Sequence, residues 1–340
     1  MTIHKNPTIE FNVIFGKIEI NSPYLYLKGK SSKPLCDEMN ITHCGRSETV
    51  NRALTDFGIE ESFAKAAKRF KEHYNFEISI SAVNRATKES AKRAESFINE
   101  KLSEFKDEDN QRKMESADKM LIEIDGCEIR TAQWEIDENS KETTPAYNNP
   151  KKKKIVNWRD VRLGFARPLE SEDKTFIGKM DSYPVVVNQL HDAALMRGMT
   201  PSTLIIGIAD GGIGLSEELK RQFPTVQFIL DKSHLKDHFY STAEDLGIAA
   251  KDRPAWVKPR IESISNGAVE RVLKELKDLF SANGNDRLKR LIGYLERFYD
   301  SLNYDEFKDK GYPIGSGEIE SAHKYVPQKR LKIPGASWHP

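Results

Sequence analysis

Two aspartates in this sequence each follow an apolar run and precede a glycine. Asp125 follows 119–124 (KMLIEI), and Asp210 follows 204–209 (LIIGIA). A strand buried on both faces stops being apolar where it leaves the core. A carboxylate at that point projects at the carboxyl end of the sheet, where open α/β sheets place their sites. Asp-Gly is also a common turn dipeptide, which is the alternative explanation for either aspartate alone. Two such aspartates in one chain favour a shared site.

Paired carboxylates of this kind are suited to divalent-ion chemistry. Mg²⁺ prefers oxygen ligands, and two carboxylates bridge a pair of ions about 3.5–4 Å apart. One ion then activates a water or a 3′-hydroxyl, and the other stabilises the leaving oxygen of a phosphodiester. Two aspartates seldom complete such a site, so we expect a third carboxylate. Both Glu318 and Glu320 are candidates, because they follow the close turn at 315–317 (GSG) in the first turn of a predicted helix.

The elements around these residues predict a mixed sheet. Alternating or apolar runs indicate strands at 119–125, 127–136, 156–167, 204–209 and 225–230. Amphipathic patterns indicate helices at 182–198, at 214–222 and from about 232 onward. The resulting order, β-β-β-α-β-α-β-α, describes an α/β fold with helices on both faces of a mixed sheet. The residues at 250–310 show only helical patterns and predict an all-α insertion.

The N-terminal third predicts separate elements. Alternation over 8–30 around 21–23 (Asn-Ser-Pro) predicts a β-hairpin. Helical spacing then places Phe63, Ala66, Ala67 and Phe70 on one helix face, and a second helix begins at Ser81 as its N-cap. Two helices joined by a tight turn are similar to a helix-turn-helix, although a generic helical pair fits the same pattern. Eight basic and four acidic side chains over 61–93 suit contact with phosphates.

A run of positive charge marks the middle of the chain. Residues 151–168 contain seven basic side chains and one acid, a local charge of +6. Such a patch attracts phosphate backbones. A solvated loop followed by a charged strand edge is the alternative explanation.

The composition excludes several classes of protein. The 340 residues are 38% hydrophobic, with 53 Lys and Arg against 52 Asp and Glu, so the chain can bury a core and we expect two or three domains. No apolar run approaches the roughly 18 residues of a membrane span, and no secretory signal is recognisable at the N-terminus. Cys36, Cys44 and Cys127 are too few and too scattered for a disulfide framework. We therefore expect a soluble, cytosolic protein.

Several of these motifs together resemble one family. Asp125-Gly126, Ala209-Asp210-Gly211 and 315–321 (GSGEIES) are similar to segments of the DDE transposases of ISKra-type insertion sequences. The basic tail at 326–332 (VPQKRLK), with 334–338 (PGASW), resembles the segment after that family's catalytic glutamate. The stretches 56–67 and 81–85 resemble its N-terminal helical domain. The resemblance covers most of the chain, and the GSGxxES block with its basic tail is its most specific part.

The resemblance implies a ribonuclease H-like catalytic core with an all-α insertion. It implies that Asp125, Asp210 and Glu320 are the catalytic residues and the ligands of two Mg²⁺ or Mn²⁺ ions, with Glu318 as the alternative third carboxylate. The separations of 85 and 110 residues along the chain fit the family pattern. Asp231 and His234 resemble the D-x-x-H motif of Mutator-like relatives. A structural hydrogen bond at a helix start is the alternative to a catalytic role for that pair.

The activity implied by the resemblance is metal-dependent DNA cleavage and strand transfer at insertion-sequence ends. The implied partners are double-stranded DNA, at the element ends and the target, and further copies of the chain in a homo-oligomer on DNA. We expect no membrane and no small-molecule substrate, and a cytoplasmic, nucleoid-associated location. A catalytically silent DNA-binding protein derived from such an element and a ribonuclease H-like nuclease are the alternatives.

Basic residues are expected to contact DNA in three regions of the chain. They are Lys151, Lys152, Lys153, Lys154, Arg159 and Arg162 in the central patch, Arg85 in the N-terminal helices, and Lys329, Arg330 and Lys332 in the tail.

We expect five segments along the chain. They are a β-hairpin region (1–45), a helical DNA-binding-like domain (46–116), the first part of the catalytic core (117–235), the all-α insertion (236–311) and a core helix with a basic tail (312–340). Family members often carry paired cysteines near the hairpin, but none occurs here, so we expect no structural zinc. They also continue past the Trp338 region, so we expect the last segment to be truncated.

Overall fold

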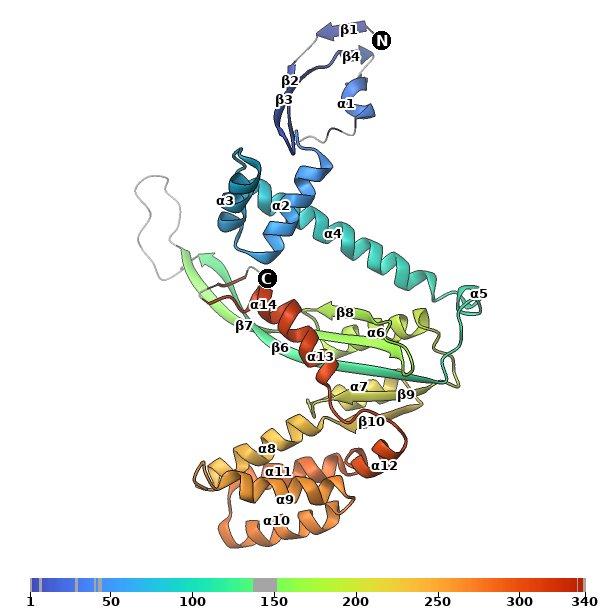
Figure 1. Cartoon of the computed structure of the whole chain (residues 1–340), viewed down its shortest axis with the longest axis vertical. Coiled ribbons are helices and arrows are strands. Elements are labelled where there is room, and N and C mark those ends of the chain that lie inside the picture. Colours follow the sequence, from blue (N-terminus) through green and yellow to red (C-terminus); the bar gives the residue numbers. More distant parts are fainter. Residues whose placement is uncertain are drawn as a thin grey trace. The chain divides into compact units, whose positions relative to one another are not determined.

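A computed structural model describes residues 2–5, 8–27, 30–39, 41, 45–136, 152–334 and 336–338 (Figure 1). The chain forms two compact units, Met1–Glu100 and Lys101–Pro340. The finer segment boundaries expected from the sequence stay predictions. Lys151 and Cys44 lie outside the described residues.

The first unit begins with two small antiparallel sheets. One contains β1 (Thr2–Lys5), β4 (Tyr24–Leu27) and β5 (Lys30–Ser32), the other contains β2 (Thr8–Val13) and β3 (Gly16–Asn21), and α1 (Pro34–Glu38) follows. The hairpin is therefore β2–β3, with its turn at 14–15, and the turn predicted at 21–23 is wrong. Alternation continues on both sides of 21–23, so the pattern alone did not locate the turn. Gly16, with a φ of 125°, supplies the backbone conformation that the turn requires.

The rest of the first unit is a three-helix cluster of α2 (Glu48–Glu60), α3 (Phe63–Tyr74) and α4 (Ile80–Glu104). The predicted apolar face of α3 is confirmed, since Ala66, Ala67 and Phe70 are buried. The prediction of Ser81 as the N-cap of the next helix is wrong: α4 begins at Ile80, so Ser81 lies within its first turn. Its first turn is capped by Ser79, whose Oγ accepts a hydrogen bond from the Ala82 amide at 3.2 Å. The pair α3–α4 is thus part of a three-helix core.

The second unit is built on a five-stranded mixed sheet in the order β10-β9-β6-β7-β8. The strands are β6 (Lys119–Ile136), β7 (Lys152–Pro168), β8 (Thr175–Lys179), β9 (Leu204–Ala209) and β10 (Val226–Leu230). The first three are antiparallel neighbours, and β9 and β10 run parallel to β6. The unit is a mixed α/β structure, as predicted.

The predicted order β-β-β-α-β-α-β-α is observed, but its first three strands differ from the prediction. The runs 119–125 and 127–136 form one continuous strand, β6, and β8 was not predicted. The pair Asp125-Gly126 breaks the apolar sequence pattern. It does not break the pairing of β6 with β7, because both residues pair with β7 in register. β8 has a single buried side chain, Ile177, which is too little apolar content to be recognised as a strand.

Helices cover both faces of this sheet. The helices after the strands are α6 (Tyr183–Met196), α7 (Leu215–Gln222) and α8 (Lys232–Asp245), and α5 (Glu108–Gln111) precedes the sheet. A Cβ at Gly164 would lie 2.9 Å from Leu190 Cδ1, so a glycine there lets α6 approach β7 closely. The side chain of Glu123 on β6 meets α13 (Gly317–His323). Gly164 lies directly opposite Ile124 and therefore shares its face of the sheet. Glu123, the residue before Ile124, points to the other face. Helices α6 and α13 therefore cover opposite faces.

An all-helical segment lies between α8 and α13, as predicted. It contains α9 (Arg253–Ser265), α10 (Val269–Asn283), α11 (Asp286–Arg297) and α12 (Tyr304–Asp309), with a 3₁₀ turn at Tyr299–Ser301. Its buried side chains belong to the same core as the sheet. After α13, a π-helical turn (Lys324–Gln328) and α14 (Lys329–Leu331) lead back to the sheet. There the Trp338 amide donates to the Arg130 carbonyl at 3.0 Å.

Within the described ranges of the chain, no helix is both long enough and apolar enough to cross a membrane.

One buried hydrogen bond joins the helical segment to the strand that leads into the site. Tyr304 is fully buried, and its hydroxyl donates to the Leu230 carbonyl of β10 at 2.8 Å. We expect Tyr304→Phe to lower the free energy of unfolding by about 1–2 kcal/mol, because the buried carbonyl loses its donor. Urea denaturation measures this change. Tyr299→Phe, at an exposed tyrosine of the same segment, is the control and should change little; equal stability of both variants would contradict the prediction.

Candidate metal centre at the sheet edge

The register of three parallel strands brings three aspartates to one edge of the sheet. Ile124 of β6 pairs with Ala209 of β9, and Ala209 pairs with Leu230 of β10. The next residue on each strand path is Asp125, Asp210 or Asp231. The three aspartates therefore lie level with one another: Asp210 and Asp231 follow β9 and β10 directly, and Asp125 lies within β6 where its pairing with β9 ends. Sites of open sheets lie at this carboxyl end. Asp125 is also the point where β6 leaves the core, since every residue from Met120 to Ile124 is buried.

The acidic side chains gather around one histidine. The ligand atoms of Asp125, Asp210 and His234 all lie within 4.8 Å of one another. Those of Asp231, His234 and Glu320 form a second group within the same limit, and His234 belongs to both. Of the predicted residues, Asp125 and Asp210 are thus brought together in one group, and Glu320 lies in the second group with Asp231; His234 is the member that both groups share. Their catalytic role stays a prediction.

Asp231 and His234 form a buried ion pair at the start of α8. Asp231 is fully buried; its Oδ1 accepts a hydrogen bond from the His234 amide at 2.7 Å and lies 3.1 Å from His234 Nδ1. Burial raises the pKa of Asp231, but the bonds from His234 and Ser316 outweigh it and lower the pKa to about 2. The bond to Asp231 raises the pKa of His234 to about 9 despite its burial, with Asp210 and Asp125 adding to the effect. The imidazole is therefore positively charged at neutral pH.

Asp231 also holds the segment that carries Glu320. Its Oδ2 accepts a hydrogen bond from the Ser316 amide at 2.5 Å, one residue before α13 begins. Both carboxylate oxygens of Asp231 are therefore engaged by protein donors. The arrangement assigns Asp231 a structural contact at a helix start, as one of the two sequence hypotheses proposed.

His323 fixes the backbone of Asp125 from α13. Its ring is buried, with 1% of the side chain exposed, and Nε2 donates to the Asp125 carbonyl at 3.0 Å. Its Nδ1 has no hydrogen-bond partner among the described residues. No sequence motif marks His323, although its spacing of three residues from Glu320 places both on one helix face.

The turn after Asp210 depends on glycine. A Cβ at Gly211 would lie 2.2 Å from the Tyr294 ring, so only glycine lets α11 approach this loop. The Tyr294 hydroxyl accepts a hydrogen bond from the Gly211 amide at 3.2 Å, and burial raises the pKa of that hydroxyl above its usual value. Asp210 Oδ1 accepts from the Gly212 amide at 3.1 Å, which orients the carboxylate. The Asp-Gly signal at Asp210 thus reflects close packing beside the site.

Glu318 points away from the acidic groups. It forms a two-point ion pair with the buried Arg167, at 2.7 and 3.2 Å, and a second pair with Lys174 at 2.9 Å. Partial burial raises the pKa of Glu318, but the bonds from Arg167 and Lys174 outweigh it and lower the pKa. Of the two candidate third carboxylates, Glu320 is therefore the one near the aspartates, and Glu318 anchors α13 to the sheet.

The predicted DNA-binding residues lie in different surroundings. Lys152, Lys153, Lys154 and Arg159 are exposed on β7, whereas the Arg162 side chain is only 14% exposed. Arg162 pairs with Asp160 at 2.9 Å and stacks over the Tyr183 ring at 4.2 Å. It forms part of the wall beside Asp210. In the tail, Lys329 and Lys332 are exposed and Arg330 is half-buried; Arg85 is exposed on α4 of the first unit.

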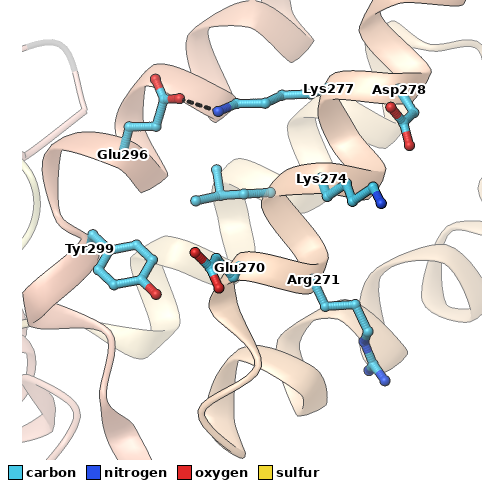
Figure 2. A pocket seen from close by; sticks show the side chains of 8 residues that line it. Glu270, Arg271, Lys274, Lys277, Asp278, Glu296 and Tyr299 are labelled. Carbon is cyan, nitrogen blue, oxygen red and sulfur yellow. Dashed lines mark ion pairs between the residues drawn. The ribbon is translucent and has the colours of Figure 1, made fainter.

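A separate hollow of about 810 Å³ lies on the helical segment (Figure 2). It is lined by Glu270, Arg271, Leu273, Lys274, Lys277, Asp278, Glu296 and Tyr299. Lys277 and Glu296 form an ion pair at 2.7 Å across it. Acidic and basic side chains balance there, and none of the sheet-edge carboxylates takes part.

The donor set at the sheet edge fits a hard divalent cation. Asp125 and Asp210 offer oxygens within a few ångströms of each other, and the Asp125 side chain is 18% exposed, so an ion can reach it. Glu320 lies in the adjoining group. His234 belongs to both groups, and an ion bound there would compete with the proton on its imidazole. The carboxylates of Asp125 and Asp210, with Glu320 or His234 as a further ligand, are therefore the residues that fit such an ion.

Comparison with known proteins gives little further guidance. No protein-family model matches the chain, and no curated protein matches it. Among solved structures, the Drosophila P element transposase strand transfer complex is similar with a TM-score of 0.30 and 12% sequence identity, over 84% of this chain and 80% of that one. A similarity this weak leaves the assignment to the geometry of the site.

Glu123 makes folding stability depend on pH. It is 1% exposed, and burial raises its pKa to about 8 although it accepts a hydrogen bond from the Ile319 amide. Between pH 4.5 and about 8, Glu123 keeps its proton in the folded state and loses it in the unfolded state. Its contribution to the folding stability is therefore complete below pH 4.5 and is lost as the pH rises to about 8. We expect this loss to be about 1.4 kcal/mol per pH unit within that window.

The variant Glu123→Gln isolates this contribution, because the amide stays neutral at every pH. The difference in unfolding free energy between variant and wild type should move in favour of the variant between pH 4.5 and about 8. Urea unfolding at a series of pH values measures it. A difference independent of pH would contradict a buried, protonated Glu123.

Proposed function

We propose that this chain is a DDE transposase with a ribonuclease H-like core, which cleaves DNA at the ends of a mobile element and joins them to a target. The observation that carries the proposal is the convergence of Asp125, Asp210 and Glu320 around His234 at the carboxyl edge of the sheet. The strand order supports it, because three antiparallel strands followed by two parallel ones match the core that the sequence motifs imply. The all-helical segment before α13 fits the expected insertion.

The proposed mechanism uses two Mg²⁺ or Mn²⁺ ions held by Asp125, Asp210 and Glu320. When bound, such ions activate the attacking oxygen and stabilise the leaving oxygen of a phosphodiester. Water is the first nucleophile and the freed 3′-hydroxyl is the second, so no covalent protein–DNA intermediate forms.

The chain's own groups orient the site. His323 fixes the Asp125 backbone, the Gly212 amide orients Asp210, and Asp231 holds the start of the helix that presents Glu320. In the absence of an ion, the His234 imidazolium offsets the charge of Asp231 and lies beside the other carboxylates. These contacts preorganise the oxygens, which lowers the cost of arranging them when an ion and the DNA bind.

DNA would be held by phosphate contacts from basic side chains. Lys151–Lys154 and Arg159, with Lys329, Arg330 and Lys332, would supply them in the core unit, and the helices of the first unit, including Arg85, would recognise the element end. Assembly on DNA would involve more than one copy of the chain, because two element ends must be joined.

Strand cleavage tests the proposal. Labelled duplexes that carry the DNA flanking the coding sequence should be nicked in Mg²⁺, to leave 3′-hydroxyl ends, and not in EDTA. Asp125→Asn, Asp210→Asn and Glu320→Gln should each lower the cleavage rate by about 100-fold or more, because each removes a charged ligand oxygen. DNA binding, measured by anisotropy in EDTA, should persist in all three variants.

The matched control is Glu270→Gln, an identical change at an exposed carboxylate of the helical hollow. It should keep Mg²⁺-dependent cleavage, since none of the sheet-edge carboxylates takes part in that hollow. Undiminished cleavage by any of the three ligand variants would reject that residue. Cleavage without joined products would favour a nuclease, and binding without cleavage at any metal concentration would favour a silent DNA-binding protein.

A further inference from the structure

Strands β6 and β7 continue beyond the five-stranded sheet as a two-stranded ribbon. The parallel pairing of β6 with β9 ends at Ile124, whereas its pairing with β7 continues to Ile136 and Lys152 (Figure 1). The described part of this ribbon comprises 127–136 and 152–161. It begins at the edge of the sheet that carries Asp125, whose side chain leaves β6 on the same face as Ile129 and Thr131.

The register places two tryptophans on one face of the ribbon. Arg130 pairs with Trp158, Ala132 with Val156, and Trp134 with Lys154. Directly opposed residues share a face, as do residues two apart on one strand. These six side chains therefore form a single strip, which we call the tryptophan face: Arg130, Ala132, Trp134, Lys154, Val156 and Trp158.

The tryptophan face is open to solvent. Trp134 is 64% exposed and Trp158 is 62% exposed, and Val156 between them is 38% exposed. The opposite face is covered, since Ile129 and Thr131 are buried. The Trp338 segment lies along the edge of β6, where it bridges Thr131, and the Lys154 ammonium donates a hydrogen bond to Ser337 Oγ at 3.2 Å. A tryptophan can bury about 150–250 Å² of surface, so two exposed rings on one strip leave a large apolar area for a partner.

The charge on the same strip selects the partner. Arg130 and Lys154 lie directly across the strands from Trp158 and Trp134. Glu128 and Asp160, which pair with each other on the sheet side of Trp158, lie on the same face and are acidic, so the positive charge is confined to the outer part of the face. Lys152, two residues from Lys154, extends the same face and is exposed. Lysine is depleted in protein–protein interfaces, whereas aromatic rings interleaved with cations are the pattern that binds unpaired nucleotides. Bases stack on the rings, and the cations contact the phosphates.

We propose that the tryptophan face binds a single-stranded segment of DNA, with bases stacked on Trp134 and Trp158. The phosphate contacts of the proposed function need no exposed indole, so this goes beyond them. It rests on the proposed function only for the source of the strand, which is the DNA next to the cleaved bond. Trp158 pairs with Arg130, five residues along β6 from Asp125, or about 17 Å at the rise of a strand. Trp134 is nine residues from Asp125, or about 30 Å.

Binding of an oligothymidylate of about 12 nucleotides tests this inference. The full chain is titrated in EDTA, where no cleavage can occur, so the result does not depend on whether the metal centre is active. Trp134→Ala and Trp158→Ala should each weaken binding about fivefold or more, and the double variant should weaken it further. Trp134→Phe and Trp158→Phe should retain most of the affinity, because a phenyl ring still stacks. Tyr299→Ala, at an exposed ring of the helical segment, is the matched control and should bind as wild type does.

Three further measurements decide between outcomes. Binding to a duplex of the same length should change less than twofold in the tryptophan variants, since paired bases are not available for stacking. Oligothymidylate affinity unchanged in both alanine variants would overturn the inference. So would loss of self-association in those variants, measured by sedimentation, with unaltered oligonucleotide binding, because the face would then join copies of the chain. Circular dichroism melts establish that each variant is folded.

Discussion

The acidic side chains at the sheet edge gather around one histidine, so positive charge lies among them. In the described structure this charge is on His234, whose pKa is raised to about 9, while that of its partner Asp231 is lowered to about 2. One imidazolium offsets one carboxylate of the four that surround it. The carboxylates of Asp125 and Asp210, and that of Glu320 in the adjoining group, also lie around His234, where a divalent cation would add positive charge.

Backbone geometry imposes this electrostatic arrangement. The register Ile124–Ala209–Leu230 places the three aspartates level with one another, and glycine at 211 lets α11 pack against the loop that follows the second. The fourth carboxylate, Glu320, comes from a distant part of the chain, on α13. Its position therefore depends on how α13 is fixed to the sheet. The contacts that fix it are a charged one from Glu318 to Arg167, a short one from Asp231 to the Ser316 amide, and a buried one from Glu123 to the Ile319 amide.

Much of this arrangement could be predicted from the sequence, because it leaves local signals. Apolar strands ending in an aspartate gave the positions of Asp125 and Asp210, and helical periodicity gave α6, α7, α8 and the helical segment. Contacts between distant segments leave no such signal. The choice between Glu318 and Glu320, the role of His323 and the burial of Glu123 depend on which way α13 faces, and a sequence does not contain that orientation. The strand β8 has too few apolar residues to be recognised, and β6 continues through a dipeptide that resembles a turn.

Anomalous diffraction from crystals grown with Mn²⁺ tests the central claim most directly, because it locates the ion without relying on activity. The account predicts manganese density in contact with the carboxylates of Asp125 and Asp210, with Glu320 as the third acidic neighbour. Well-ordered crystals in which those carboxylates bind no ion at millimolar Mn²⁺, or in which manganese binds only at acids of the helical hollow such as Glu270 and Glu296, would contradict it.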